Sequence, residues 1–219
     1  PKGYKDSPVG VIPEDWQVQE FGKLGKFVGG GTPSTAVANY WEGDIPWISS
    51  SDIFEDDIKS ISITRYITKQ AIKESSTKLI TKGSVIFVSR VGVGKLAVNN
   101  LDLCTSQDFV NFTPSSKKIS SLFVGYYFLK NNRLFQSYKQ GTSIKGFTQT
   151  NLKKIKIAFP PIQEQEKIVE VLLTWDKAIE KQTQLIEKLE ERKKGLMQQL
   201  LTGKKRLPGF SGDWKEVKL

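Results

Sequence analysis

The stretch from Pro160 to Leu201 constrains the fold of this 219-residue chain more than any other. After Pro161 it contains no proline and one glycine, Gly195. Apolar residues recur with the 3-4 spacing of a heptad, which is typical of a long α-helix that packs along another long helix. Such a helix would rise roughly 60 Å, more than a compact domain needs. The seam that we expect to mediate pairing consists of Leu172, Trp175, Ile179, Ile186, Leu189, Leu196 and Leu200, interrupted by Gln182 and Lys193. The alternative is a surface helix that folds back on its own domain.

The sequence before this helix predicts a globular α+β domain. Short apolar and β-branched segments alternate irregularly with short helical segments, which argues against a doubly wound sheet. We predict strands at residues 58–66, 84–89, 96–98, 104–112 and 152–159, and helices at residues 68–75, 122–129 and 134–138. The expected domains are residues 1–160, a long helix at 161–203 that forms a coiled coil, and a tail at 204–219.

Composition excludes several kinds of chemistry. The chain has one cysteine, Cys104, and no histidine, so internal disulfides, Cys-based metal sites and Ser-His or Cys-His nucleophiles are excluded. No apolar run approaches the length of a membrane span. We therefore expect a cytoplasmic protein with no membrane contact, no metal and no cofactor.

The placement of positive charge indicates a polyanionic partner. The formal net charge is +10, and no acidic residue occurs between Asp108 and Glu164. That one-signed stretch is typical of a nucleic-acid-binding surface, although an idle basic surface stays open. Its basic residues are Lys117, Lys118, Lys130, Arg133, Lys139, Lys145, Lys153, Lys154 and Lys156.

Two glycine-rich segments are candidates for close backbone approach to a ligand. Residues 29–34 read Gly-Gly-Gly-Thr-Pro-Ser, which either cradles a phosphate with backbone N–H groups or is a plain turn. The turn from Arg90 to Lys95 is not a Walker loop, because Ser89 and Leu96 stand where that motif requires glycine and Ser/Thr.

A set of short motifs in this order resembles the specificity (S) subunit of type I restriction-modification systems. They cover nearly the whole chain, and each is weak when taken singly. The opening motif recurs in the tail, where Leu207-Pro208 is followed by Trp214, as if a second repeat began there. The motifs are Ile12-Pro-x-x-Trp16, Gly31-Thr-Pro-Ser34, Ile45-Pro-Trp-Ile48, Arg90-x-Gly92-x-x-Lys95, Ser106-Gln107 and Pro160-Pro161-x-x-Glu164-Gln165.

The resemblance implies a non-catalytic reader of double-stranded DNA. The family's full-length subunit alternates two target recognition domains with two helical regions, and this chain resembles one of each. It would read one half of a split target, dock methyltransferase (M) subunits and, through them, restriction (R) subunits. The sequence agrees that catalysis is absent, since the only Pro-Pro pair, Pro160-Pro161, lies outside an adenine methyltransferase motif.

The candidate DNA-binding residues are polar side chains on predicted loops. The pair Ser106-Gln107 fits a purely structural role as well as it fits contact with DNA bases. The candidates are Ser49, Ser50, Asp52, Arg90, Lys95, Gln107, Lys145 and Gln149.

Two alternative functions stay open. A basic coiled-coil scaffold would bind nucleic acid without sequence preference. A nuclease would need Mg²⁺, which Asp44, Asp52, Asp56 and Asp57 would have to hold, although these residues also fit a solvated acidic loop.

Charge along the long helix predicts the direction of pairing. Residues 162–180 carry five acidic and two basic side chains, whereas residues 181–206 carry three acidic and eight basic ones. An antiparallel homodimer sets acidic halves beside basic halves, and a parallel one sets like charges together. We therefore expect an antiparallel homodimer with a palindromic split target.

Overall fold

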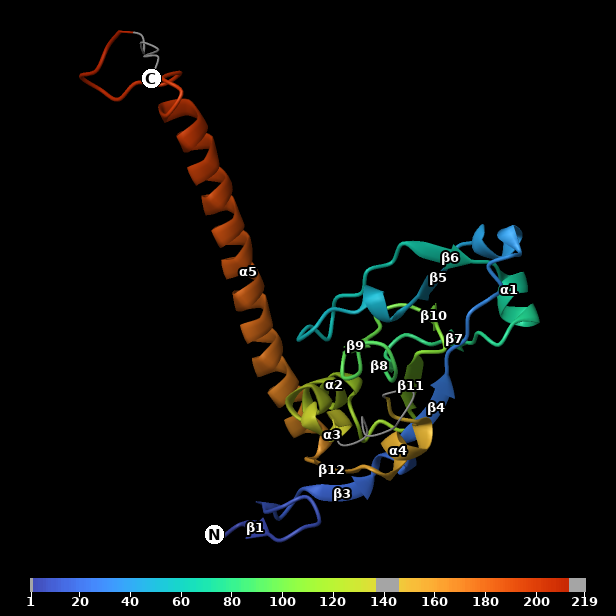
Figure 1. Cartoon of the computed structure of the whole chain (residues 1–219). Coiled ribbons are helices and arrows are strands. Elements are labelled where there is room, and N and C mark those ends of the chain that lie inside the picture. Colours follow the sequence, from blue (N-terminus) through green and yellow to red (C-terminus); the bar gives the residue numbers. More distant parts are fainter. Residues whose placement is uncertain (1, 137–145, 213–219) are drawn as a thin grey trace. The chain divides into compact units, whose positions relative to one another are not determined.

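The computed structural model of the protein describes residues 2–136 and 146–212. The chain divides into two compact units, residues 1–169 and residues 170–219 (Figure 1). Strands and short helices form the first unit, and the second contains most of one long helix. The α+β class and the long C-terminal helix are therefore confirmed.

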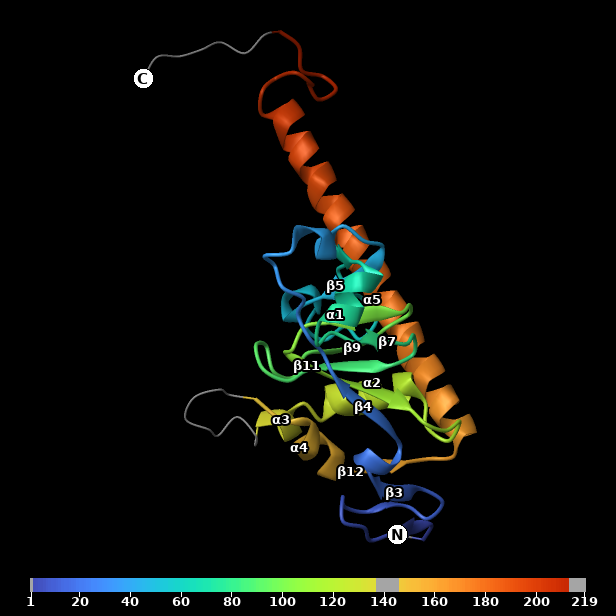
Figure 2. The ribbon, with the colours of Figure 1, turned by 90° about the vertical axis from the view of Figure 1, so that its right-hand side faces the viewer.

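Two four-stranded sheets form the centre of the first unit (Figures 1 and 2). Their strands are β4 (Gly25–Gly29), β5 (Ile45–Ile48), β6 (Arg65–Ile67), β7 (Leu79–Ile80), β8 (Val85–Val88), β9 (Leu96–Val98), β10 (Leu103–Thr105) and β11 (Phe109–Pro114). The first sheet has the order β6-β5-β10-β7, in which only β5 and β10 run parallel. The second has the order β4-β11-β8-β9 and is antiparallel throughout.

Two smaller ribbons complete the strands of the described residues. The strands β1 (Tyr4–Lys5) and β2 (Ile12–Pro13) pair with each other, and β3 (Gln17–Glu20) pairs antiparallel with β12 (Lys156–Phe159). This second ribbon places the start of the chain beside the strand that leads into the long helix.

Helices begin where a side chain can accept the first free N–H groups. Thr68, Ser120 and Thr148 do so for α1 (Lys69–Glu74), α2 (Ser121–Lys130) and α4 (Gln149–Lys154). The predicted helix over residues 68–75, capped by Thr68, is thus confirmed. The remaining helices are α3 (Arg133–Gln136), α5 (Ile162–Leu200) and the 3₁₀ turns η1 (Phe21–Lys23), η2 (Ala38–Trp41) and η3 (Ser50–Asp52).

The core of the first unit is built on phenylalanine rings. Phe21 is fully buried, and its ring centroid lies 4.2 Å from that of Phe112 and 4.9 Å from that of Phe128. Phe128 stacks on Phe135, which stacks on Phe147. The helix α2 thereby packs against β8 and β9, and its phenylalanines are core rather than exposed stacking platforms.

The predicted strand over residues 104–112 is wrong, because it is two strands separated by a turn. The Asp108 N–H donates to the Ser106 hydroxyl (3.3 Å), and the Phe109 N–H donates to the Ser106 carbonyl (3.3 Å). A serine side chain that bonds the backbone two residues ahead favours a turn over a continuous strand. The turn directs β10 into one sheet and β11 into the other.

Two further strand boundaries differ from prediction. Residues 149–154 form α4 because Thr148 and Asn151 make a reciprocal capping box, so only Lys156–Phe159 of the predicted strand 152–159 is a strand. Residues 58–64 form a loop in which Ile61 makes one isolated bridge to Ile53, and the strand β6 begins at Arg65.

The first turn of α5 is fixed by Gln165, which has no exposed surface. Its Nε2 donates to the carbonyls of Lys118 (2.9 Å) and Pro160 (2.8 Å), and its Oε1 accepts the Ser120 N–H (2.9 Å). One side chain therefore ties the start of α5 to the N-cap of α2.

Candidate nucleic-acid interface

Polar side chains gather where the parallel strands β5 and β10 end. The Ser106 N–H donates to the Ile48 carbonyl (2.9 Å), so the two chains remain paired up to the last residue before their loops. Ser49 follows β5, and Gln107 follows β10 by one turn residue. Parallel neighbours end at the same edge of a sheet, which brings these two loops together.

The loop after β5 is organised by Asp52. Its Oδ2 accepts the Ser49 N–H (2.7 Å) and the Ser49 hydroxyl (3.1 Å), which closes the η3 turn that begins at Ser50. The same oxygen pairs with the guanidinium of Arg65, whose Nη2 also donates to the Ser49 hydroxyl (2.7 Å). Two predicted contact residues, Ser49 and Asp52, thus share one network.

Arg65 belongs to this site, although sequence reasoning did not single it out. It is the cross-strand partner of Trp47, and its guanidinium carbon lies 4.6 Å from the centroid of the indole ring. The indole is held in turn, because its Nε1 donates to the Gly31 carbonyl (2.9 Å). The arginine at the start of β6 was visible in the sequence, but the pairing of β6 with the Ile-Pro-Trp-Ile strand β5 was not, so Arg65 could not be identified.

The glycine loop before η2 is a packing element and not a phosphate cradle. The Gly30 N–H donates to the Phe109 carbonyl (3.4 Å) and the Gly31 N–H to the Thr105 carbonyl (2.8 Å), so neither is available to a ligand. A Cβ on Gly30 would lie 1.9 Å from the Ser106 carbonyl oxygen. The glycines therefore allow two backbones to approach closely.

Gln107 is exposed at the end of the same loop system. Its Oε1 accepts the hydroxyl hydrogen of Thr32, which follows the glycine loop. Ser106 is buried and forms the turn, so the two members of the predicted pair have different environments.

The turn between β8 and β9 lies next to η3. Gly92 and Gly94 have φ values of 84° and 106°, which glycine tolerates best. Lys95 donates from Nζ to the Ile53 carbonyl (3.3 Å), one residue after Asp52. Arg90 is exposed, and it follows Ser89, whose N–H donates to the Asp108 carbonyl (2.7 Å).

The candidate Gln149 is not brought into this cluster. Gln149 begins α4, and its Nε2 donates to the Phe27 carbonyl (3.3 Å), so it has no hydrogen bond to the cluster among the described residues. Lys145 lies outside the described residues, as does Lys139 of the basic stretch. The other seven basic residues of that stretch are exposed, except Lys153, which is half-buried with its Nζ 5.5 Å from the centre of the Phe27 ring.

Two of the four acidic residues offered as a metal site, Asp52 and Asp57, have other partners. Asp52 pairs with Arg65. Burial opposes ionisation of Asp57, but hydrogen bonds from the Ser60 side chain and from the Lys59 and Ser60 N–H groups outweigh it and lower the pKa of this carboxyl. Within residues 2–136 and 146–212, no three His, Cys, Asp or Glu side chains are grouped closely enough to hold a metal ion. In the same residues no helix combines the length and apolar character of a membrane span.

A protein-family model described as the type I restriction modification DNA specificity domain matches residues 13–191. The chain belongs to this family. The match covers the cluster at the ends of β5 and β10 and most of α5. It therefore confirms the resemblance that the short motifs carry.

Relatives of this specificity domain include subunits of type I restriction enzymes. It is 35% identical over 193 residues to the MjaIX specificity subunit of Methanocaldococcus jannaschii, covering 85% of this chain and 44% of that subunit. It is 32% identical over 183 residues to the EcoR124I/EcoR124II specificity subunit of Escherichia coli, covering 79% and 44%. The chain thus spans less than half the length of these relatives.

Solved structures of the family share the fold. One chain, from a study of complex assembly and conformational transition in a type I R-M system, superimposes with a TM-score of 0.68 at 20% identity, covering 87% of this chain and 46% of that one. The HsdS subunit from Thermoanaerobacter tengcongensis gives 0.62 at 17% identity, covering 81% and 41%. At these identities the likeness supports the fold alone.

Proposed function

We propose that this specificity domain reads one half of a split target in double-stranded DNA and contributes no catalytic residue itself. The observation that carries the proposal is the family match together with the polar cluster at the ends of β5 and β10. In this role, basic side chains hold the DNA backbone and the cluster contacts base edges. The candidates for contacts to DNA are Ser49, Ser50, Asp52, Arg90, Lys95, Gln107, Lys145 and Gln149.

Selection from a random duplex pool tests the reading function. The full chain should enrich one half-site sequence or a palindromic pair of half-sites. Its binding to unselected duplex should fall steeply with salt, with a log-log slope of several units, because Lys and Arg displace counterions from phosphates. Binding with a steep salt dependence but no enriched sequence would favour the nonspecific scaffold instead.

We further propose that the chain docks methyltransferase (M) subunits and, through them, restriction (R) subunits in the cytoplasm. The relatives are named as subunits of type I restriction enzymes, which supports this assignment. The purified chain should transfer no methyl group from S-adenosylmethionine, and transfer to DNA should appear only when an M subunit is added. Transfer by the chain alone would contradict the non-catalytic role.

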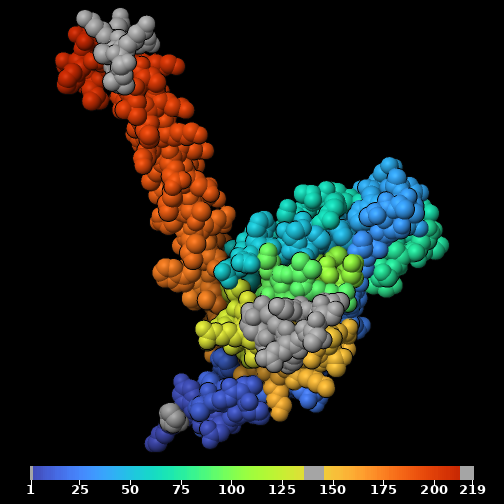
Figure 3. Space-filling model, viewed as in Figure 1, coloured from blue at the N-terminus to red at the C-terminus, as the bar shows by residue number. Residues whose placement is uncertain are grey.

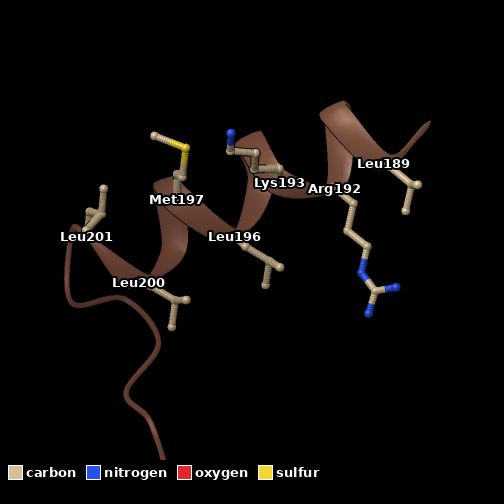
Figure 4. A pocket seen from close by; sticks show the side chains of 7 residues that line it. All are labelled: Leu189, Arg192, Lys193, Leu196, Met197, Leu200 and Leu201. Atoms are coloured by element: carbon tan, nitrogen blue, oxygen red, sulfur yellow. The ribbon is translucent and has the colours of Figure 1, made fainter. Parts of the chain in front are cut away.

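The apolar face of α5 supports pairing with a second copy of the chain. Trp175 and Ile179 are 66% and 63% exposed, and Ile186, Leu189 and Leu196 are exposed as well. Leu189, Leu196 and Leu200 point to the same side of the helix and line a groove near its C-terminal end (Figure 4). In Figure 3 the helix surface is drawn in orange to red. A seam of this length favours a partner that covers it.

Charge complementarity supports the antiparallel direction. The acidic first half of α5 and its basic second half attract when two copies run in opposite directions, and repel when they run in the same direction. Exposed ion pairs contribute only tenths of a kcal/mol each, so the seam provides affinity and the charges provide orientation. Antiparallel pairing would set the two reading units at opposite ends of the pair, since each precedes its own helix.

The two polar interruptions of the seam select a single antiparallel register. In that register Gln182 of one helix faces Lys193 of the other, so a Lys ammonium can donate to an amide oxygen. A shift by one heptad in either direction would set both polar side chains against apolar ones. The apolar layers of the proposed register are Trp175 with Leu200, Ile179 with Leu196, and Ile186 with Leu189.

Cysteine cross-linking tests direction and register together, in a Cys104→Ser background. A mixture of Ile186→Cys and Leu189→Cys chains should form a disulfide-linked heterodimer efficiently. Mixing Ile186→Cys with Gln182→Cys reports the shifted register and should give little product. Efficient homodimer formation by Ile179→Cys alone would indicate parallel pairing and contradict the model, because the antiparallel register sets the two copies of Ile179 roughly 25 Å apart along the helix axis.

A further inference from the structure

A groove lies beside the polar cluster, and its walls combine aromatic rings with one arginine. Thr32, Trp41, Glu42, Trp47 and Arg65 line it, and its volume is about 640 Å³, which falls within the usual range of ligand sites. The segment that carries η2, β5, η3 and β6 forms one part of the surface of the first unit (Figure 3, light blue to teal). Building on the proposed DNA-reading function, we propose that Arg65 reads a purine by donating to N7 on its major-groove edge, and that Asp52 and Trp47 position it.

Three contacts fix the guanidinium of Arg65 before any ligand arrives. Its Nη2 donates to Ser49 Oγ and to Asp52 Oδ2, and its guanidinium carbon lies over the ring of Trp47. These supports are themselves held, since the Asp52 side chain is 12% exposed and the indole is bonded to the Gly31 carbonyl. A guanidinium that is already oriented loses little side-chain entropy on binding, which favours a geometrically selective contact.

The rest of the guanidinium is available for a ligand. Its side chain is 38% exposed, and Nη2 uses both of its hydrogens on Ser49 and Asp52. In the described part of the chain, no acceptor is bonded to Nε or Nη1. Arg65 therefore presents unpaired donors in a groove that Thr32 also lines, and the Thr32 hydroxyl donates to Gln107.

The local charge favours a base edge over a phosphate. Asp52 neutralises Arg65 through their ion pair, and the exposed carboxylate of Glu42 also lines the groove. A phosphate would meet this negative charge, whereas purine N7 and guanine O6 are neutral acceptors that an arginine donor satisfies. The cluster is therefore suited to recognise a base, whereas the basic residues elsewhere would bind the phosphate backbone of the DNA.

The test combines two arginine variants with a modified base in the sequence that the wild-type chain enriches. For each purine of that sequence, a duplex carries the 7-deaza analogue, which lacks the N7 acceptor. At one position the analogue should weaken wild-type binding about 10-fold or more, the size expected for loss of a specific base contact. The Arg65→Ala chain should bind the parent duplex correspondingly more weakly and should not distinguish the analogue at that position. Arg65→Lys should behave like Arg65→Ala, because an ammonium lacks the fixed fork.

The positioning role of Asp52 has a separate readout. Asp52→Asn keeps a hydrogen-bonding group but removes the negative charge, so binding to unselected duplex should strengthen while the preference at the Arg65 position falls. Lys82→Ala, which removes one exposed positive charge outside the cluster, serves as the control and should leave the preference at every base unchanged.

Three results would overturn the inference. If Arg65→Ala weakens all duplexes equally and lowers the salt slope by about one, Arg65 contacts phosphate. If Arg65→Ala keeps the wild-type sensitivity to every 7-deaza analogue, Arg65 does not contact N7. Either result leaves the proposed function intact. If the wild-type chain enriches no sequence, the proposed function fails and this inference fails with it.

Discussion

Replacing Gln165 by alanine should destabilise the first unit by about 3 kcal/mol. The side chain is fully buried and makes three hydrogen bonds, to the carbonyls of Lys118 and Pro160 and to the Ser120 N–H. A net hydrogen bond contributes about 1 kcal/mol, and a buried group left without a partner costs about 1–3 kcal/mol. The better helix propensity of alanine recovers only a few tenths of a kcal/mol.

Urea denaturation followed by tryptophan fluorescence measures this loss. A background with both Trp175→Phe and Trp214→Phe confines the signal to Trp16, Trp41 and Trp47 of the first unit. With a denaturant slope of about 2 kcal/mol/M, the midpoint should fall by about 1.5 M. Gln163→Ala is the matched control, because Gln163 lies in the same helical turn with its side chain exposed, and it should change stability by less than about 0.5 kcal/mol. If the two variants have the same midpoint, the buried amide does not hold α5 to α2 and the reasoning fails.

Three further predictions concern packing, titration and assembly. Gly30→Ala should strongly destabilise the fold in a thermal melt, because the added Cβ would lie 1.9 Å from the Ser106 carbonyl oxygen. Gly29→Ala is the control: its added Cβ would have open space, so this variant should melt like the wild type. Burial raises the pKa of the Cys104 thiol to about 11 from 9.0, so iodoacetamide should modify it very slowly at pH 8. Its contribution to stability is complete below about pH 9 and is lost as the pH rises towards 11, which should make the wild-type urea midpoint fall more over that window than that of Cys104→Ser. Replacing Gln182 and Lys193 together by leucine should strengthen the dimer, as measured by sedimentation equilibrium, but should allow disulfide cross-links in several registers. If that variant still cross-links in one register, the polar layer does not select the register.

The elements that the sequence predicted correctly depend on local signals. Thr68 caps α1, and the heptad pattern of residues 162–200 extends over many turns, so neighbouring residues were sufficient to identify both helices. The boundary at Ser106 failed because the alternating residues on either side fit one strand as well as two. What separates them is a side-chain bond from Ser106 together with different partners for β10 and β11, and neither is visible in a local pattern.

The candidate site was predictable only in part, for the same reason. Ser49 and Asp52 directly follow the Ile-Pro-Trp-Ile motif, which made them reasonable candidates, whereas Gln107 fell inside the predicted strand over residues 104–112. Their proximity depends on the parallel pairing of β5 with β10 across more than 50 residues of sequence. Arg65 joins them through its cross-strand pairing with Trp47 after an irregular loop, so its role required the register of β6.

The turn from Thr105 to Phe109 has a consequence for retargeting. Its backbone is held by bonds from Ser106, Asp108, Phe109 and Gly31, and none of these bonds uses the side chain at position 107. A substitution library at the exposed position 107 should therefore fold on an unchanged scaffold. Chains that differ in their target can share this framework, because the atoms that determine the shape of the loop are separate from those that face outward.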